Sequence, residues 1–565
     1  MISRQLAAAA AFGLFTTALT TPAHAEWLEA KSAHFTLVGD VSEPRLRRKV
    51  ERLERFDAMM RLIVPNAMQA NLPVYIVDGT GDVRRLLGDP NGSVGAFFNP
   101  SVFGVFAVSP LQTGTGGEIT GEAVLFHEYV HHMLLSNLDD PMPGWMSEGM
   151  AELFMNTSLE SDGSVMIGLG NSGRGYSLNR MGRWDAKRLF ESGTKPPAQN
   201  DIDQLYAKGW LVMHYLLFSG KRPGEFGKFA AGLKRGLPQL QAAQEAFGDL
   251  GKFETELEFY RRRPALPAIR IAPDQLKVTS GMSVRKLNAA EAEIMPMRLQ
   301  SMVGVSARTA APLALNARPI GARYPENAFV QRAVAEMEFD ARNFDLADAA
   351  VNRALAADPN YIDALCMKGL LIGNRARREG KPELWREARA VILKANKLSP
   401  DMALPFILYF DTFEASGGVP NKGTVDGLMR AIVIQPTYQD LRVKVGLHLI
   451  ATGDPVRARQ VLAPVAFSPH TKPDNPLAKL LAEIDQGTRG EALAAKVREL
   501  KVKSLNLFDL STLPKQDDTA GKDDKAKYGF GSPNAGFSPE ILDKMLRQLD
   551  AETERLSKVS GESVR

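Results

Sequence analysis

The sequence predicts an α+β domain followed by an all-α domain of helical repeats. Between residues 26 and 262, short runs that alternate apolar and polar residues are interspersed with amphipathic helical stretches. After Tyr324, prolines recur at Pro359, Pro400 and Pro436, which lie 41 and 36 residues apart. A proline that recurs at this interval, after a stretch with two helical patterns, indicates stacked two-helix units.

Length and composition limit the classes of protein that fit. A chain of 565 residues is expected to hold two to four domains, and its 44% hydrophobic and 24% charged residues are typical of a globular protein. The net charge is only +4 and no long basic cluster is present, which argues against a nucleic-acid partner. Cys366 is the only cysteine, so no intramolecular disulfide is expected, and its helical pattern predicts a buried thiol.

The first 25 residues have the pattern of a signal peptide. Arg4 provides a positive start, residues 6–19 are apolar, and Ala23 and Ala25 form a small-x-small cleavage site before Glu26. The apolar run is short for a membrane anchor. We therefore expect an exported, periplasmic protein whose mature chain has no transmembrane segment.

Composition changes set the expected domain boundaries. The order is a signal peptide, an α+β domain, a linking module that begins after the proline-containing break at Arg261, helical repeats, and a tail. The tail combines a disordered linker rich in Asp, Lys, Gly and Ser with a charged terminal helix. The boundaries are 1–25, 26–262, 263–322, 323–510 and 511–565.

Local patterns place the elements of the α+β domain and the linking module. Alternation or apolar runs predict the strands, and a 3.6-residue period predicts the helices. The expected strands are 34–38, 72–77, 95–98, 102–108 and 165–167, with 269–271 and 276–278 in the linking module. The expected helices are 44–63, 120–135, one beginning near Gly144 after a proline turn, and several between 202 and 262.

The chemistry centres on residues 127–132, which read HEYVHH. His127 and His131 are four apart, so on a helix both imidazoles can face one metal ion. Glu128 lies about 100° around the helix, where its carboxylate can take a proton from a metal-bound water. His132 points away from that face and is expected either to support a ligand from behind or to be structural.

A catalytic zinc needs three protein ligands and an open position. Glu148 is the candidate third ligand, because the proline turn before Gly144 lets the next helix fold back on the first. Glu152 lies one turn further on the same face, where it could accept a hydrogen bond from a ligating histidine. A solvent-facing acid is the alternative role for Glu152.

The stretch WMSEGMAE at residues 145–152, together with HEYVHH, resembles the gluzincin zinc metallopeptidases. The resemblance implies a zincin-like fold, a Zn²⁺ cofactor, Glu148 as a ligand, Glu128 as general base and Glu152 as the acid that orients a histidine. The stretch LYAKGWLVMHYLLF at 205–218 is similar to a segment of the leukotriene-hydrolase type aminopeptidases. That likeness implies that Tyr206 stabilises the oxyanion, with packing as its alternative role and His214 as an alternative oxyanion donor.

One departure from those aminopeptidases concerns the substrate. They carry a glutamate that binds the free amino terminus, and Phe98 stands where that acid would be. The resemblance therefore implies an endopeptidase, and we expect the strand 102–108 to be the sheet edge that pairs with an extended peptide.

The repeats resemble tetratricopeptide repeats, in which small residues let paired helices pack closely. This resemblance implies a solenoid that recruits a substrate or a protein partner. The resulting prediction is an exported zinc peptidase that acts on a peptide or protein substrate. The alternatives are a catalytically inactive scaffold that binds proteins and a zinc hydrolase acting on a non-peptide amide.

Overall fold

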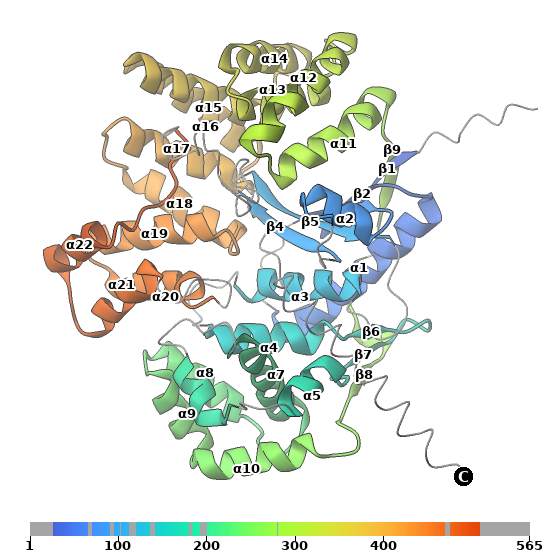
Figure 1. Ribbon diagram of the computed structural model, residues 1–565, viewed down its shortest axis with the longest axis vertical. Helices are drawn as coiled ribbons and strands as arrows, with labels where there is room; N and C mark the ends of the chain where they lie inside the picture. Colours follow the sequence, from blue (N-terminus) through green and yellow to red (C-terminus); the bar gives the residue numbers. More distant parts are fainter. Residues whose placement is uncertain are drawn as a thin grey trace, which may run out of the picture.

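The computed structural model has an α/β region at its amino-terminal end and an all-helical region after it (Figure 1). It describes residues 26–65, 71–90, 95–101, 103–111, 120–135, 142–179, 184–192, 201–279, 281–468 and 475–508. The expected signal peptide and the expected linker and terminal helix of the tail lie outside the described residues. None of the described helices combines the length and apolarity that a membrane span requires.

A mixed sheet forms the centre of the α/β region. Among the described residues it has six strands, in the order β4-β5-β3-β2-β1-β9. Strands β2, β3 and β5 run parallel, and β4, β1 and β9 are antiparallel to their neighbours. The strands are β1 (Trp27–Lys31), β2 (Phe35–Asp40), β3 (Leu72–Val77), β4 (Phe97–Ser101), β5 (Gly104–Pro110) and β9 (Ser283–Lys286).

The expectation that residues 102–108 form the sheet edge is wrong. Most of that stretch belongs to β5, which is hydrogen-bonded to β3 on one side and to β4 on the other. Strand β4 is the edge instead. Alternation in the sequence identifies a strand, but it carries no information about the neighbours of that strand in the sheet.

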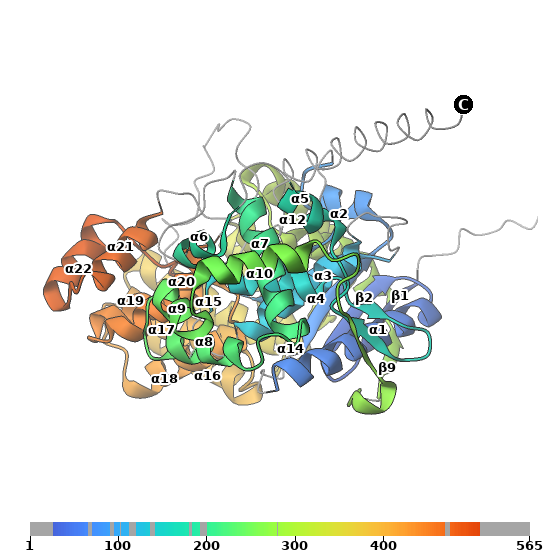
Figure 2. The same cartoon turned by 90° about the horizontal axis from the view of Figure 1, so that it is seen from below.

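Helices cover both faces of the sheet. The helices of the α/β region are α1 (Glu43–Ile63), α2 (Thr80–Leu86), α3 (Gly121–Leu134), α4 (Gly144–Phe154), α5 (Ser172–Asn179), α6 (Ala186–Glu191), α7 (Ile202–Phe218), α8 (Glu225–Lys234), α9 (Gln239–Phe247) and α10 (Leu250–Arg261). Because side chains alternate along a strand, Phe98 packs in one core with α1 and α3, whereas Phe97 packs in a second core on the other face. Helices α4 and α7 form a further layer beyond α3, and α10 lies across α7 when the molecule is seen from below (Figure 2).

Segment 263–322 is divided between the two regions. Strand β8 (Ile269–Ile271) pairs with β7 (Val165–Ile167), and β7 also pairs with β6 (Ser158–Leu159). Residues 276–278 do not form the expected strand, and β9 instead adds to the large sheet beside β1. Helix α11 then packs its Met295 and Leu299 on the second core.

The helical region consists of antiparallel pairs that curve around the sheet (Figure 1). Its helices are α11 (Ala289–Val303), α12 (Ala307–Arg323), α13 (Ala328–Asp340), α14 (Phe344–Ala357), α15 (Ile362–Glu379), α16 (Glu383–Leu398), α17 (Ala403–Ala415), α18 (Lys422–Ile434), α19 (Gln439–Ala451), α20 (Pro455–Ala466), α21 (Pro476–Asp485) and α22 (Gly490–Glu499). Pro359, Pro400 and Pro436 each follow the last residue of a second helix by two positions, as the proline spacing predicted. A Cβ at Gly369 would lie 2.5 Å from Ile392 on the paired helix, so the absent side chain sets how closely α15 and α16 approach.

Helices α4 and α7 cross with their backbones in contact. A Cβ at Gly149 would lie 2.6 Å from the carbonyl of Gly209, and a Cβ at Gly209 would lie 2.5 Å from the carbonyl oxygen of Trp145. No side chain fits between two backbones at that distance. The two glycines therefore fix the position of α4 relative to α7.

We predict that Gly149→Ala lowers the free energy of unfolding by about 1–3 kcal/mol, because the added methyl group pushes α4 away from α7. Urea unfolding of the variant and the wild type measures the difference. Gly227→Ala is the matched control, since a Cβ there meets nothing within 4 Å. The control should be neutral or gain up to about 1 kcal/mol in helix α8. An equally stable Gly149→Ala protein would contradict the close crossing.

Candidate metal centre

Helix α3 is anchored to α1 at two points. Its first turn is capped by Thr120, whose hydroxyl accepts the backbone N–H of Ala123 at 3.0 Å. Near that end, the buried carboxylate of Glu122 forms ion pairs with Lys49 and Arg52 of α1. Further along the helix, the hydroxyl of Tyr129 donates to Asp57 of α1 at 2.6 Å. These contacts hold the remaining face of α3 toward α4.

Three side chains from α3 and α4 converge on one point. The Nε2 atoms of His127 and His131 lie 3.2 Å apart, and they lie 3.4 and 3.3 Å from Oε2 of Glu148. A tetrahedral zinc ion with bonds of about 2.0–2.1 Å separates its ligand atoms by about 3.3–3.4 Å. The three atoms therefore have the spacing of a tetrahedral metal site with its fourth position open. They also form one of the two groups of described residues whose ligand atoms could surround an ion.

Both histidines are held by partners on α4. The Nδ1 atom of His131 lies 2.9 Å from the hydroxyl of Ser147. The Nδ1 atom of His127 lies 3.6 Å from Oε1 of Glu152, which places this acid beside the histidine that it was expected to orient. The hydrogen-bonded Nδ1 of His131 leaves its Nε2 to face the candidate metal position, whereas Nδ1 of His127 lies beyond hydrogen-bond distance of Glu152.

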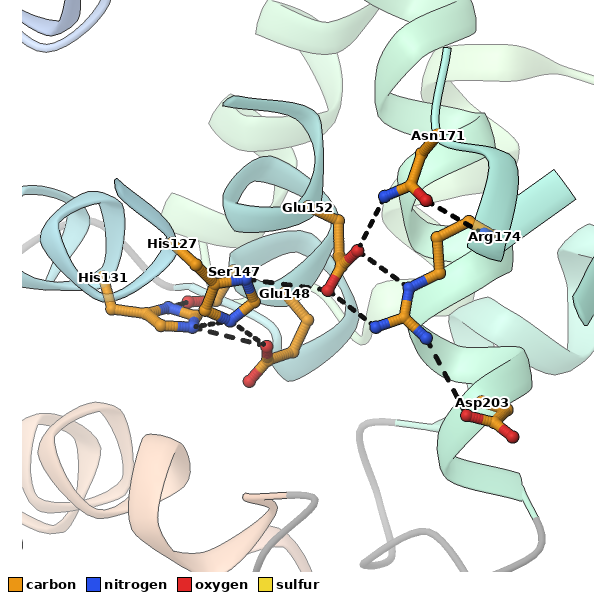
Figure 3. A network of polar contacts seen from close by, with 8 residues as sticks. All are labelled: His127, His131, Ser147, Glu148, Glu152, Asn171, Arg174 and Asp203. Carbon is orange, nitrogen blue, oxygen red and sulfur yellow. Dashed lines mark hydrogen bonds and ion pairs between the residues drawn. The ribbon is translucent and has the colours of Figure 1, made fainter. Parts of the chain in front are cut away.

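A second layer of polar contacts holds Glu152 (Figure 3). Arg174 on α5 donates to both carboxylate oxygens of Glu152, with distances of 2.7 Å for Nε and for Nη2. The side-chain amide of Asn171 donates to the same carboxylate at 3.1 Å, and Asp203 lies 3.8 Å from Arg174. Burial opposes the charge on Arg174, but Glu152 raises the pKa of the guanidinium, which therefore stays charged. Glu152 is therefore a buried, paired acid and not a solvent-facing one.

Sequence reasoning missed Ser147, Asn171 and Arg174. Arg174 lies on α5, which begins at Ser172, and its side chain reaches Glu152 on α4. The available signal was the role expected for Glu152, because an acid buried beside a histidine requires a cationic partner. Nothing in the sequence identifies which arginine supplies it.

Tyr206 lies directly behind His127. Their rings are nearly parallel, with centroids 6.3 Å apart, and the guanidinium of Arg174 lies over the Tyr206 ring at 4.9 Å from its centroid. Tyr206 is only 2% exposed, and burial together with nearby Glu148 raises its pKa well above its usual value. Its phenol is therefore a neutral hydrogen-bond donor at ordinary pH.

His214 is turned away from this centre. One ring nitrogen lies 2.8 Å from the hydroxyl of Tyr260 and the other lies 2.9 Å from the carbonyl oxygen of Gly168. Both nitrogens are thus used within the packing of α7. Of the two oxyanion donors considered from the sequence, only Tyr206 adjoins a side chain of the candidate metal centre.

Glu128 and His132 occupy different environments. Glu128 lines the same cavity as His127, His131 and Glu148, as the position after a ligating histidine predicts. The ring of His132 lies instead near Phe98, and burial lowers its pKa to about 4. His132 is consequently neutral and structural.

The other group that could hold an ion consists of His34, Glu54 and Asp57. Its members are already bonded to one another and to their neighbours. His34 lies 2.7 Å from Glu54, and Asp57 accepts hydrogen bonds from Arg61 and Tyr129. The guanidinium of Arg61 supplies the positive charge there. We interpret this group as a buried hydrogen-bond network that supports α3.

The candidate metal centre opens into a cleft between the two regions of the chain. The cleft, of about 790 Å³ including the part open to solvent, is lined on one side by Phe98, Pro100 and the residues of the candidate metal centre. Its opposite wall comes from the helical region and includes Gln439 and Arg442 of α19. Nη2 of Arg442 donates to the carbonyl oxygen of Leu135, at the end of α3, at 3.1 Å. The helical region therefore forms part of this site.

Phe98 of β4 is an apolar lining residue of the cleft. That Phe98 replaces an acid of the related aminopeptidases stays a prediction from the sequence. The sequence did not indicate that residues more than 300 positions downstream complete the same cleft.

Comparison with known proteins gives no family assignment. No protein-family model matches the chain, and none of the curated proteins that were searched matches it significantly.

We predict that the affinity for zinc rises with pH. Burial lowers the pKa of His131, but the carboxylates of Glu148, Glu128 and Glu152 raise it to about 9. In metal-free protein this imidazole is protonated below that pH, and the proton must leave before Nε2 can bind a metal. Affinity should therefore increase about tenfold per pH unit up to about pH 9 and then level off.

Competition between metal-free protein and a chromophoric chelator, corrected for the chelator's own protonation, measures this dependence. A zinc affinity that stays constant between about pH 6 and pH 9 would show that His131 carries no proton in the metal-free protein.

Proposed function

We propose that this protein is an exported, zinc-dependent peptidase of the gluzincin type, with a tetratricopeptide-like repeat domain that forms one wall of its substrate cleft. The observation that carries the proposal is the triangle formed by Nε2 of His127, Nε2 of His131 and Oε2 of Glu148. Its edges of 3.2, 3.4 and 3.3 Å match the ligand spacing of tetrahedral zinc.

Within this proposal each side chain has one task. A zinc ion held by the triangle would supply an acidified water and a polarised scissile carbonyl. Glu128 takes the proton from the attacking water and passes it to the leaving amine, because it is the carboxylate next to the ligands that lines the cleft. Tyr206 donates a hydrogen bond to the developing oxyanion, a task suited to its neutral phenol.

The form of the cleft favours an internal peptide bond as the substrate. Phe98 supplies an apolar wall where an aminopeptidase of the related type has an acid. The opposite wall offers polar neutral groups and Arg442, and the cleft is open to solvent. A peptide chain in extended form fits such a space, and edge strand β4 borders it.

The alternative proposal is a protein-binding scaffold with an inactive zinc domain. It is favoured by the position of Tyr206, which is buried and is not one of the residues that line the cleft. Action on a non-peptide amide remains a third alternative. Activity measurements on residues with separate tasks distinguish these functions.

We predict that Glu128→Gln keeps its zinc and loses peptide hydrolysis by at least about 100-fold, because the amide cannot accept the proton of the water. Glu148→Ala should instead lose the metal, since only two ligands remain. Metal analysis and digestion of a peptide mixture derived from a proteome, with and without chelator, measure both properties. Glu245→Gln, an exposed acid on α9, is the control. Hydrolysis by Glu128→Gln at the wild-type rate would refute the peptidase assignment of this site.

We predict that Tyr206→Phe lowers kcat by about 100-fold, with little change in KM, zinc content or unfolding temperature, because it removes one oxyanion donor and keeps the ring beside His127. Steady-state kinetics on a peptide found in the digestion experiment provide the measurement. An unchanged kcat would assign Tyr206 to packing alone.

A further inference from the structure

The chain that follows α22 returns to the middle of the helical region. Residues 500–508 contain no helix or strand, and they run back along α19 to reach α15, α16 and α17 (Figure 1). Leu507 and Phe508 are buried there, and Phe508 is 0% exposed. Residues 502–506 have no regular secondary structure and 507–508 form a turn, in which the side-chain oxygen of Asn506 accepts the backbone N–H of Phe508 at 3.0 Å. The segment Ser504–Phe508 thus packs as a short irregular peptide between helices.

The groove has a pocket for one aromatic ring. The ring of Phe508 meets Trp385 of α16 edge to face, with centroids 5.3 Å apart. On the α15 side, a Cβ at Gly373 would overlap the Phe508 ring. Glycine weakens a helix interior by about 1 kcal/mol relative to alanine, so its presence in α15 is explained by the space that Phe508 needs.

Polar groups of the groove bind the backbone and one side chain of the segment. The carboxylate of Asp411 accepts the backbone N–H of Leu507 at 3.0 Å, and Asp411 is paired with Lys444 at 2.8 Å. The side-chain amide of Asn506 donates to the carbonyl oxygen of Asp411 at 3.3 Å and to Glu414 at 3.2 Å. Lys444 also donates to the hydroxyl of Ser504 at 3.4 Å.

This combination has the form of peptide recognition. The buried carboxylate of Asp411 binds the backbone of the segment, and the carbonyl oxygen of Asp411 accepts a hydrogen bond from the Asn506 amide. The space between Gly373 and Trp385 fits the ring of Phe508. Asp411 and Lys444 are both almost fully buried, and such a pair recovers its desolvation cost only when its remaining hydrogen-bond capacity is used. The segment uses that capacity. It lies beyond the last described helix, so its departure interrupts no helix of the region.

We propose that the groove formed by α15, α16, α17 and α19 is a peptide-binding site for a segment that ends in a turn with the pattern Asn-apolar-Phe, and that Ser504–Phe508 is its ligand within the same chain. The partner is a peptide of that pattern on another protein, which binds by displacing Ser504–Phe508. The groove lies apart from the metal centre, and this proposal does not depend on the peptidase function.

The test uses a fluorescent peptide, KVKSLNLF, which copies residues 501–508. The full-length chain with Asn506→Ala and Phe508→Ala releases its own segment and should bind the peptide at least about 10-fold more tightly than the wild type, as measured by fluorescence anisotropy. A peptide with its Phe replaced by Ala should bind about 30-fold more weakly to that variant. Adding Gly373→Val to the released variant should abolish binding, because the valine fills the ring pocket.

Circular dichroism and thermal unfolding establish that the variants are folded. A folded, released variant that binds KVKSLNLF no more tightly than the wild type, or that binds a scrambled peptide equally well, overturns the proposal. If release of Ser504–Phe508 unfolds the helical region of the variant, a measurement on the wild type still tests the proposal. Excess KVKSLNLF should increase hydrogen exchange at the amides of residues 504–508, and unchanged exchange there would show that the segment is a permanent part of the core.

Discussion

The candidate metal centre requires three atoms from two separate helices to lie within 3.4 Å of one another. His127 and His131 lie on α3 and Glu148 lies on α4, so the relative position of these helices must be fixed to a fraction of an ångström. Helix α3 is held by the ion pairs and the Tyr129–Asp57 hydrogen bond to α1. Helix α4 is held by its backbone contact with α7. Packing on α1 thus fixes α3, packing on α7 fixes α4, and the candidate metal centre lies between these two helices.

Charge imposes a second constraint on the same place. Glu148 and Glu152 are both almost fully buried, and each must be neutralised. Burial raises the pKa of Glu148, but the two histidines lower it well below its usual value. Glu152 instead takes its compensation from Arg174, and that arginine also lies over the ring of Tyr206. The residue that stabilises the orienting acid therefore also fixes the expected oxyanion donor.

The sequence identifies those parts of the site that follow from local patterns. His127, Glu128 and His131 share a motif with a helical period. Glu148 and Glu152, which follow the proline turn, have the same four-residue spacing as the two histidines. The proline intervals likewise predicted where the helix pairs end. Arg174 could not be predicted, because it reaches Glu152 from a short helix with no distinctive pattern. The edge strand was misplaced because the order of strands is set by long-range pairing.

Long-range contacts also explain why the cleft wall was missed. Helix α19 carries residues with contacts in two places, since Arg442 lines the cleft and Lys444 contacts the segment that ends at Phe508. Burial lowers the pKa of Arg442 to about 10, which still leaves it charged at neutral pH.

The position of Arg442 is favourable because a cation at the carboxyl end of a helix interacts well with the free carbonyl groups there. Leu135, at the end of α3, provides such a carbonyl group. The width of the cleft is therefore set by the packing of the repeats as well as by the α/β region. Any ligand that enters the cleft therefore contacts both regions, and α19 links the cleft, through Arg442, to the segment that ends at Phe508, through Lys444.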